Sequence, residues 1–363
     1  MHNKTNVIAV TNGISLIVPV LNEVMHIQGT IESLLEQDAS HVIQEFLFID
    51  GGSRDGTCEI IRRYARAHSS VKLLENPRRT TPVALNIGLR AARGEYVGIL
   101  GAHASYPPDY IRICWEELQA HNAAGCSGRL LTLPADQTLG ARLAAWCMGH
   151  RFASSGISAR TRREGYANTI PYPVFRKQAL IDAGGYDETL DRNQDNEMNE
   201  RLRANGHRLY LTARTQAAYY ARPGIVSLLA HAYNTGKWNG KTVRRRRGGL
   251  SLYHFVPLAF LLTTLATLAF VPVCMKRSGS VSLSLLLLTL PITAHLFMGI
   301  LSGIDTAVHQ RSAGALLLPP VILAFHLAYG VGTAVGLLGR LSLCEYRAAS
   351  HREVVNGLRT KGS

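Results

Sequence analysis

Three long apolar stretches in the C-terminal part of the chain limit most strongly what it can fold into. They are YHFVPLAFLLTTLATLAFVPV (253–273), VSLSLLLLTLPITAHLFMGIL (281–301) and GALLLPPVILAFHLAYGVGTAVGLL (314–338). Each has the roughly 20 residues needed to cross the hydrocarbon core of a bilayer, and none contains Asp, Glu, Lys or Arg. A buried helix of a soluble protein would explain any one of them, but three in succession favour a membrane domain.

Basic residues flank these stretches on both sides. Arg244 to Arg247 precede the first stretch, which favours a cytoplasmic N-terminal part. Three crossings would put the C-terminal tail outside, although that tail is basic too, so a re-entrant or interfacial stretch stays open. We expect a cytosolic domain at residues 1–245, a membrane domain with about three transmembrane helices at 246–340, and a basic tail at 341–363.

The composition points to an acidic partner. The 363 residues carry a formal net charge of +14, and the pI is about 9.8. Nucleic acid, anionic lipid and a phosphorylated substrate all fit this charge. The six cysteines are scattered without a CxxC pair, which favours reduced thiols in the cytosol over a disulfide framework or a zinc site. The N-terminus is too polar for a secretory signal peptide.

Up to residue 100 the pattern alternates between strands and helices. Apolar runs rich in β-branched residues predict strands at Ile14–Val20, Ile43–Ile49, Val71–Glu75 and Tyr96–Leu100. Helical spacing predicts helices over 22–37, around Ile60 to Tyr64, and over Thr81–Ala92. Such alternation predicts a mostly parallel, doubly wound α/β sheet, in which ligands bind beyond the carboxyl ends of the strands.

Polar residues follow three of these strands. They are Asn22-Glu23, the run Asp50 to Asp55, and His103. The run from Asp50 to Thr57 is either an ordinary turn or a nucleotide site, in which Asp50 accepts hydrogen bonds from a base or ribose. The chain has no GxGxxG after its first strand and no GxxxxGK[ST], so dinucleotide oxidoreductases and P-loop enzymes are disfavoured.

Six segments in order carry a more specific signal. They are VPVLNE (18–23), FIDGGSRDGT (48–57), NPRRTTPVALNIGLRAARGEYV (76–97), AHASYPPDY (102–110), GGYDETLDRNQDNEMNERLRANG (184–206) and YNTGKWNGK (233–241). Over roughly residues 13 to 245 the chain resembles the inverting glycosyltransferases of family 2, which have the GT-A fold. Within that family it is most similar to membrane-attached bacterial enzymes of exopolysaccharide synthesis, of the succinoglycan type.

The resemblance implies roles for individual residues. Glu23 and Asp50 would lie against the base and ribose of a nucleotide sugar, with Arg78 near the same pocket. Asp195 would be the catalytic base that takes the proton of the acceptor hydroxyl. The family has a Glu-Asp pair here, whereas this chain has Gln194 before Asp195. The alternative is that Asp195 only favours a helix N-terminus.

The family's metal-binding Asp-x-Asp element corresponds to Gly101-Ala102-His103 in this chain. The resemblance therefore implies a divalent cation, Mn²⁺ or Mg²⁺, with His103 as a remaining ligand and with the first carboxylate replaced by Gly101. Histidine suits Mn²⁺ better than Mg²⁺, which prefers oxygen. We expect weakened metal binding, with Lys237, Lys241 and the Arg244 to Arg247 run as compensating charge.

Lys237-Trp238 stands where the family has an Arg-Trp pair. Trp238 would form a platform for a sugar, and Lys237 would approach the diphosphate. An interfacial helix explains the same residues, because Trp beside Lys and Arg is common at a membrane surface. The basic run at Arg244 would also suit nucleic acid, but the apolar stretches that follow favour lipid headgroups.

These observations lead to one expected function and two alternatives. We expect a hexosyltransferase of the bacterial inner membrane, multi-pass, with its catalytic domain in the cytoplasm. It would transfer a sugar from a nucleotide diphosphate donor, with UDP favoured, to a polyprenyl-linked saccharide. One alternative acceptor is polyprenyl phosphate itself. A non-catalytic relative that binds nucleotide sugars within a polysaccharide assembly complex is the other alternative, and Gly101 and Gln194 keep it open.

Overall fold

A computed structural model of the chain describes residues 13–154, 158–162, 164–190, 193–221, 224–245, 252–278 and 283–339. The chain divides into two compact units. The first contains Met1–Leu130, Arg163–Ala218 and Cys344–Ser363, and the second contains Leu131–Arg162 and Tyr219–Leu343. The basic tail expected at 341–363 lies outside the described residues, as do Arg246 and Arg247. The domain boundaries expected from the sequence stay a prediction.

The described residues form one nine-stranded mixed sheet, in the order β3-β2-β1-β4-β8-β6-β9-β5, with β7 paired to β9. The strands are β1 (Ile14–Val20), β2 (Ile43–Asp50), β3 (Val71–Glu75), β4 (Tyr96–Ile99), β5 (Ala104–Ser105), β6 (Gly125–Pro134), β7 (Gly165–Tyr166), β8 (Val174–Arg176) and β9 (Leu209–Ala221). Strands β1 to β4 pair in parallel, whereas β8 runs antiparallel to both β4 and β6. The four strands expected from the sequence are confirmed, to within a residue at each end.

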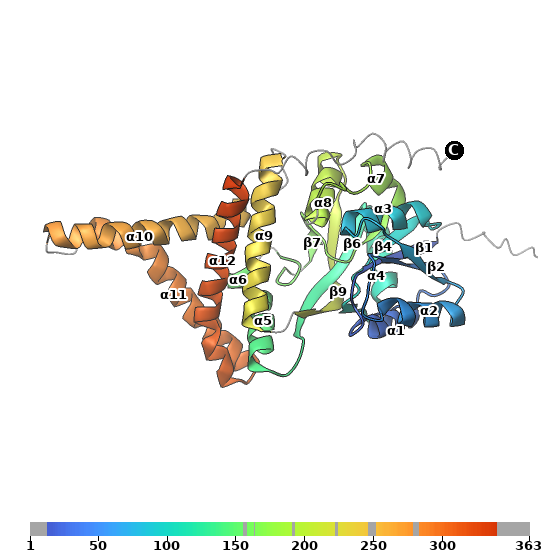
Figure 1. Cartoon of the computed structure of the whole chain (residues 1–363), viewed down its shortest axis with the longest axis horizontal. Coiled ribbons are helices and arrows are strands. Elements are labelled where there is room, and N and C mark those ends of the chain that lie inside the picture. Colours follow the sequence, from blue (N-terminus) through green and yellow to red (C-terminus); the bar gives the residue numbers. More distant parts are fainter. Residues whose placement is uncertain are drawn as a thin grey trace, which may run out of the picture. The chain divides into compact units, whose positions relative to one another are not determined.

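Six helices accompany the sheet within the described part of the first unit (Figure 1). They are α1 (Ile27–Leu35), α2 (Thr57–Ala67), α3 (Thr81–Ala91), α4 (Tyr110–Ala120), α7 (Lys177–Asp182) and α8 (Gln194–Ala204). Pro82 stands in the first turn of α3, where its missing N–H leaves no hydrogen bond unmade. The apolar side chains of β1 and β2 are almost entirely buried, and this core fixes where the strands end.

The second unit is helical apart from the strand ends that enter it. Its helices are α5 (Leu139–Gly149), α6 (Arg151–Ser154), α9 (Ile225–Arg245), α10 (Val256–Ser278), α11 (Leu283–His309) and α12 (Leu318–Leu338), with 3₁₀ turns at Leu252–Phe255 and Ala313–Leu317. Three segments are long and apolar enough to cross a membrane: Leu252–Phe270, Thr289–His309 and Ala313–Leu338. Leu265, Leu268 and Phe270 are exposed on α10, as expected of side chains that face lipid.

Helices α9 and α12 run side by side (Figure 1). Glycines at the crossing let the two backbones approach closely: a Cβ on Gly240 of α9 would lie 2.6 Å from the carbonyl oxygen of Thr333 on α12. Small residues at such positions are typical of helix pairs in membranes. This contact attaches α9, which carries Lys237 and Trp238, to an apolar helix of the same unit.

Candidate active site

The loop after β2 is shaped by the carboxylate of Asp50. This carboxylate accepts hydrogen bonds from the N–H groups of Gly52 at 2.8 Å and Ser53 at 3.1 Å. Burial opposes the charge of Asp50, but the hydrogen bonds from Ser53 and Gly52 outweigh it and lower the pKa of Asp50. Asp50 therefore stays ionised and holds the loop at the end of its strand.

The segment after β1 is bonded onto this loop. Asn22 donates its N–H to Ser53 Oγ at 2.8 Å, and its own Oδ1 accepts from the N–H of Arg54 at 2.9 Å. The N–H of Glu23 donates to Thr57 Oγ1 at 2.8 Å. Asn22 has a φ of 56°, a conformation in which asparagine is favoured over most residues. Two loops distant in sequence thus form one preorganised rim.

Glu23 and His103 meet at this rim. Glu23 Oε1 lies 3.2 Å from His103 Nδ1, and the side chains are 22% and 37% exposed. A hydrogen bond from α1 holds the turn that carries His103: Thr30 Oγ1 donates to the carbonyl oxygen of Ala102 at 2.8 Å. The ends of β1 and β4 therefore present a carboxylate and an imidazole side by side.

Gly101, beside His103, is covered by an aromatic ring. A Cβ added to Gly101 would lie 2.7 Å from Cε1 and 2.9 Å from the hydroxyl oxygen of Tyr172. The N–H of Gly101 donates to the buried hydroxyl of Tyr106 at 2.7 Å. Tyr172 lies outside the motifs that indicated the site from the sequence, and its position between Pro171 and Pro173 was the available signal. A side chain at position 101 is excluded unless Tyr172 moves.

Arg78 is ion-paired. Its Nη1 lies 2.7 Å from Glu188 Oε2, and its side chain is nearly half exposed. The other oxygen of Glu188 accepts from Asn86 Nδ2 of α3 at 2.9 Å, and the same amide nitrogen donates to the carbonyl oxygen of Tyr186. The segment that leads into α8 is thereby bonded to α3 and to the loop after β3. Contact between Arg78 and a nucleotide stays a prediction.

Asp195 lies in the first turn of α8 and its side chain is exposed. Many protein atoms nevertheless surround the carboxylate, and this desolvation raises the pKa of Asp195, against a hydrogen bond from the N–H of Asn196. Glu197, two residues further in the same turn, is buried and bound by Arg201 at 2.6 Å. Of the two acidic residues in this turn, Asp195 is the one that can meet a substrate.

The start of α8 is tied to the segment that carries Tyr172. Thr169 Oγ1 donates to Asn196 Oδ1 at 2.9 Å. Thr169 and Tyr172 are three positions apart in the sequence, so their Cα atoms lie at most about 11 Å apart. Because Tyr172 covers Gly101, this series of contacts joins the helix of Asp195 to the strand end of His103 within the first unit.

Residues 15–176 match the family model described as glycosyl transferase family 2. This segment is similar to family 2, and the chain is a glycosyltransferase. It is 28% identical over 331 residues to the succinoglycan biosynthesis protein ExoA of Rhizobium meliloti, covering 87% of this chain and 92% of the relative.

A second relative comes from Methanococcus voltae. It is the dolichyl N-acetyl-α-D-glucosaminyl phosphate 3-β-D-2,3-diacetamido-2,3-dideoxy-β-D-glucuronosyltransferase, 24% identical over 336 residues, which cover 90% of this chain and 98% of the relative. Among solved structures, the mannosyltransferase PcManGT from Pyrobaculum calidifontis, in complex with GDP-Man and Mn²⁺, has a TM-score of 0.55 at 19% identity, covering 90% of this chain and 88% of that chain. The GT-A fold expected from the sequence is confirmed, and the family resemblance with it.

The transferase offers a small set of ligands for a divalent cation. Within the described residues no three His, Cys, Asp or Glu side chains come together as a metal site. Glu23 and His103 are paired with each other, and Tyr172 covers the position that would carry a first carboxylate. This donor set does not fit a tightly held resident ion, so we assign no step of the reaction to a metal.

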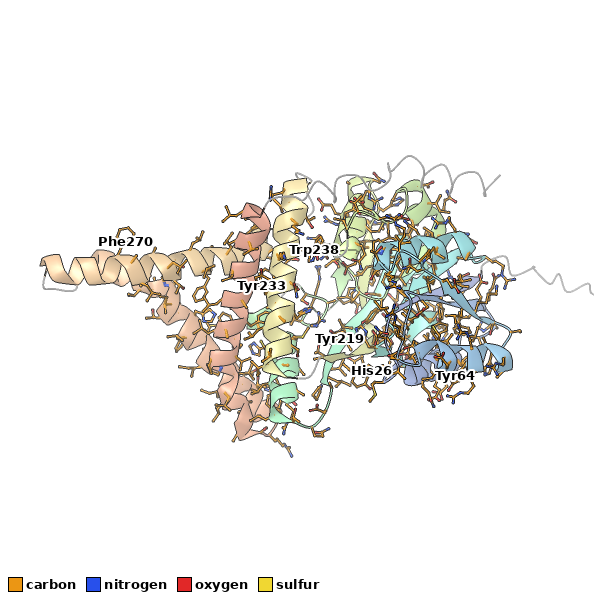
Figure 2. The ribbon with its side chains drawn as sticks, in the orientation of Figure 1. His26, Tyr64, Tyr219, Tyr233, Trp238 and Phe270 are labelled. Atoms are coloured by element: carbon orange, nitrogen blue, oxygen red, sulfur yellow. The ribbon has the colours of Figure 1, made fainter. Side chains whose placement is uncertain are left out.

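Lys237 and Trp238 belong to α9 in the second unit of the transferase. Figure 2 labels Trp238 on this helix. The Nζ of Lys241 lies 4.4 Å from the centre of the Trp238 ring, a cation–π contact along one face of the helix. Asn239, on the opposite side, is buried against the hydroxyl of Tyr329 on α12. The backbone of Lys237 packs against Gly332 and Gly336 of α12. Contact of Lys237 and Trp238 with a donor stays a prediction.

Proposed function

We propose that this transferase moves a sugar, with inversion, from a nucleotide diphosphate donor to a saccharide carried on a polyprenyl lipid. The product would enter bacterial exopolysaccharide or another cell-surface glycan. The observation that carries the proposal is the rim of the first unit. There the Asp50 loop, the Glu23–His103 pair and the start of α8 are linked by hydrogen bonds and by the Tyr172 contact.

In this proposal Asp195 is the general base. The acceptor hydroxyl gives its proton to the Asp195 carboxylate while its oxygen forms the new bond to the anomeric carbon of the donor sugar. The bond between that carbon and the diphosphate breaks on the opposite face, and its electron pair leaves with the nucleoside diphosphate. A raised pKa improves the base, because proton transfer is most efficient when the pKa lies nearer the working pH.

The donor would occupy the loops after β1, β2 and β3. The proposal gives Glu23 and Asp50 to the base and ribose, Arg78 to the same pocket, and Lys237 and Trp238 to the diphosphate and sugar. UDP is the favoured nucleotide. PcManGT was solved with GDP-Man and Mn²⁺, which supports a nucleotide sugar as the ligand class.

The acceptor is proposed to be a sugar already attached to a lipid. The relative from Methanococcus voltae is named for transfer to a sugar on dolichyl phosphate, and ExoA is named for succinoglycan synthesis. The name of the Methanococcus voltae relative favours a lipid-linked saccharide over bare polyprenyl phosphate. Three segments apolar enough to cross a membrane support a lipid-borne acceptor, and the proposed location is the bacterial inner membrane with the catalytic unit in the cytoplasm.

The test is a transfer assay with the purified full chain in detergent. Radiolabelled UDP-sugars, and separately GDP-sugars, are supplied with and without a bacterial lipid extract. Release of the nucleoside diphosphate and label in the lipid phase are both measured. We expect label in the lipid phase only when extract is present. Mild acid then releases the labelled glycan, and its length separates an extended saccharide from a single sugar on polyprenyl phosphate. No transfer from any UDP- or GDP-sugar would refute the proposal.

A further inference from the structure

Tyr172 has an unusual backbone for a tyrosine. Its φ is 48°, in the left-handed region that bulky residues rarely adopt, and it stands between Pro171 and Pro173. A residue before proline is itself restricted, so this conformation is strained twice over. Strain of this kind persists only where the surrounding structure enforces it, and it is concentrated at functional sites.

The surroundings of Tyr172 enforce this conformation. Its carbonyl oxygen accepts from the hydroxyl of Tyr110 at 2.9 Å, and the next carbonyl, of Pro173, accepts from the N–H of Ile99 in β4 at 2.8 Å. The ring of Tyr172 stands edge-on to the ring of Tyr106, with 5.7 Å between the ring centres. The backbone hydrogen bonds and the ring contact with Tyr106 together hold the phenol of Tyr172 against the end of β4.

The phenol occupies the space into which a side chain at position 101 would project. Its hydroxyl oxygen lies 2.9 Å from the place of a Cβ on Gly101. A carboxylate there would repel a diphosphate unless a cation stood between them. A phenol donates a hydrogen bond to a phosphate oxygen directly and adds no charge. A carboxylate with its cation and a phenol alone are therefore two ways to bind the same diphosphate.

We propose that Tyr172 is a donor-binding residue of this transferase, whose phenol donates to the diphosphate in place of the carboxylate that Gly101 lacks. This inference rests on the proposed function, because it assumes that a nucleoside diphosphate binds at the rim of the first unit. It has a specific consequence: Asp at position 101 restores a cation-dependent site only if the ring of Tyr172 is removed at the same time.

The test measures binding of UDP, and separately of GDP, to the full chain by calorimetry with and without Mn²⁺. Tyr172→Phe keeps the ring and the packing but removes the donor, and we expect about tenfold weaker binding of the diphosphate under both conditions. Tyr64→Phe is the matched control, since that hydroxyl bonds to Glu32 on the helical surface at 2.6 Å, and it should leave binding unchanged. Thermal unfolding of each variant reports on the fold.

Position 101 gives the second arm of the test. Gly101→Asp alone should weaken UDP binding with or without Mn²⁺, because its Cβ meets the tyrosine ring. The double variant Gly101→Asp/Tyr172→Ala should bind UDP at least tenfold more tightly with Mn²⁺ than without it. Binding that is unaffected by Tyr172→Phe, or a Mn²⁺ response equal in the single and double variants, overturns the inference. A wild-type chain that binds neither UDP nor GDP overturns the proposed function as well.

Discussion

The two rims of the parallel part of the sheet carry polar side chains in contrasting states. At the amino ends of the strands, Glu45 is fully buried and receives hydrogen bonds from Lys72 at 2.7 Å, Arg93 at 3.1 Å and Ser15 at 2.9 Å. At the carboxyl ends, Glu23 and His103 are partly exposed and are paired only weakly, at 3.2 Å.

This difference separates stability from function within one sheet. Glu45 forms hydrogen bonds with charged partners, and these bonds stabilise the folded state. Asp195 is held in place by its helix, and its carboxylate accepts only a local N–H among the hydrogen bonds described for it, which leaves room for a substrate. Substitutions at the carboxyl ends should therefore lower activity, and substitutions at the amino ends should lower the free energy of unfolding.

The largest expected effect belongs to Asp195. Asp195→Asn keeps the size of the side chain but removes the base, so we expect kcat to fall about a thousandfold. The affinity for UDP should change less than about twofold, because the base acts on the acceptor. Sugar transfer and UDP calorimetry on the same preparation measure both.

Asp182→Asn provides the control for this substitution. Asp182 ends the short helix α7, where its carboxylate accepts from Gln178 at 2.8 Å on the exposed surface. Its replacement should leave kcat unchanged. Near-normal turnover by Asp195→Asn would refute the assignment of the base, and equal losses in both variants would point to a general effect on the fold.

At the opposite rim we expect a loss of stability instead of activity. Glu45→Gln removes the charge that Lys72 and Arg93 neutralise, which should lower the free energy of unfolding of this unit by about 2 kcal/mol. Below the unfolding transition, kcat should stay near the wild-type value. Glu59→Gln is the matched control, because Glu59 is 72% exposed and lies 3.6 Å from Arg62, a pair worth at most about 1 kcal/mol.

The contrast between the rims also shows what the sequence alone reveals. The bounds of β1 and β3 are predicted residue for residue. For β1 the reason is that a buried parallel strand needs a nearly continuous run of apolar residues. The residues at the strand ends are likewise local features: Asp50 follows an apolar run directly, and Asp195 opens a helix.

Partners brought together by tertiary packing are a different matter. Arg78 and Glu188 lie 110 positions apart, and Glu23 and His103 lie 80 apart. Local patterns carry no information on such pairs. The same holds for the antiparallel β8, whose three residues are too few to show a period, and for the ring of Tyr172 against Gly101.

A smaller effect is expected at His103. His103→Ala removes the partner of Glu23 at the carboxyl ends of the strands. The KM for the donor sugar nucleotide should therefore rise about fivefold, which corresponds to the loss of one ordinary hydrogen bond. Thermal stability should change little, because the side chain of His103 is 37% exposed. His41→Ala, an exposed histidine just before β2, is the control. A drop in stability with an unchanged KM would reverse the roles of the two rims.

The smallest effect is a separation of activity from stability as the pH falls. Desolvation raises the pKa of Asp195, so the base protonates, and activity falls, at a pH above the ordinary aspartate value of about 3.9. Burial opposes ionisation of Glu45, but hydrogen bonds from Lys72 and Arg93 outweigh it and lower its pKa. Its stabilising contribution is therefore complete above the ordinary glutamate value of about 4.3 and is lost only as the pH falls through the lowered pKa.

The two events can be followed in one preparation, with kcat/KM and the thermal unfolding midpoint measured at each pH. Activity should decline while the midpoint of the wild-type chain is still constant. The stability gap between the wild type and Glu45→Gln should then close at lower pH, because protonation makes the two side chains alike in charge. A parallel decline of activity and unfolding midpoint would contradict this prediction. It would mean that loss of the fold, and not protonation of Asp195, causes the loss of activity.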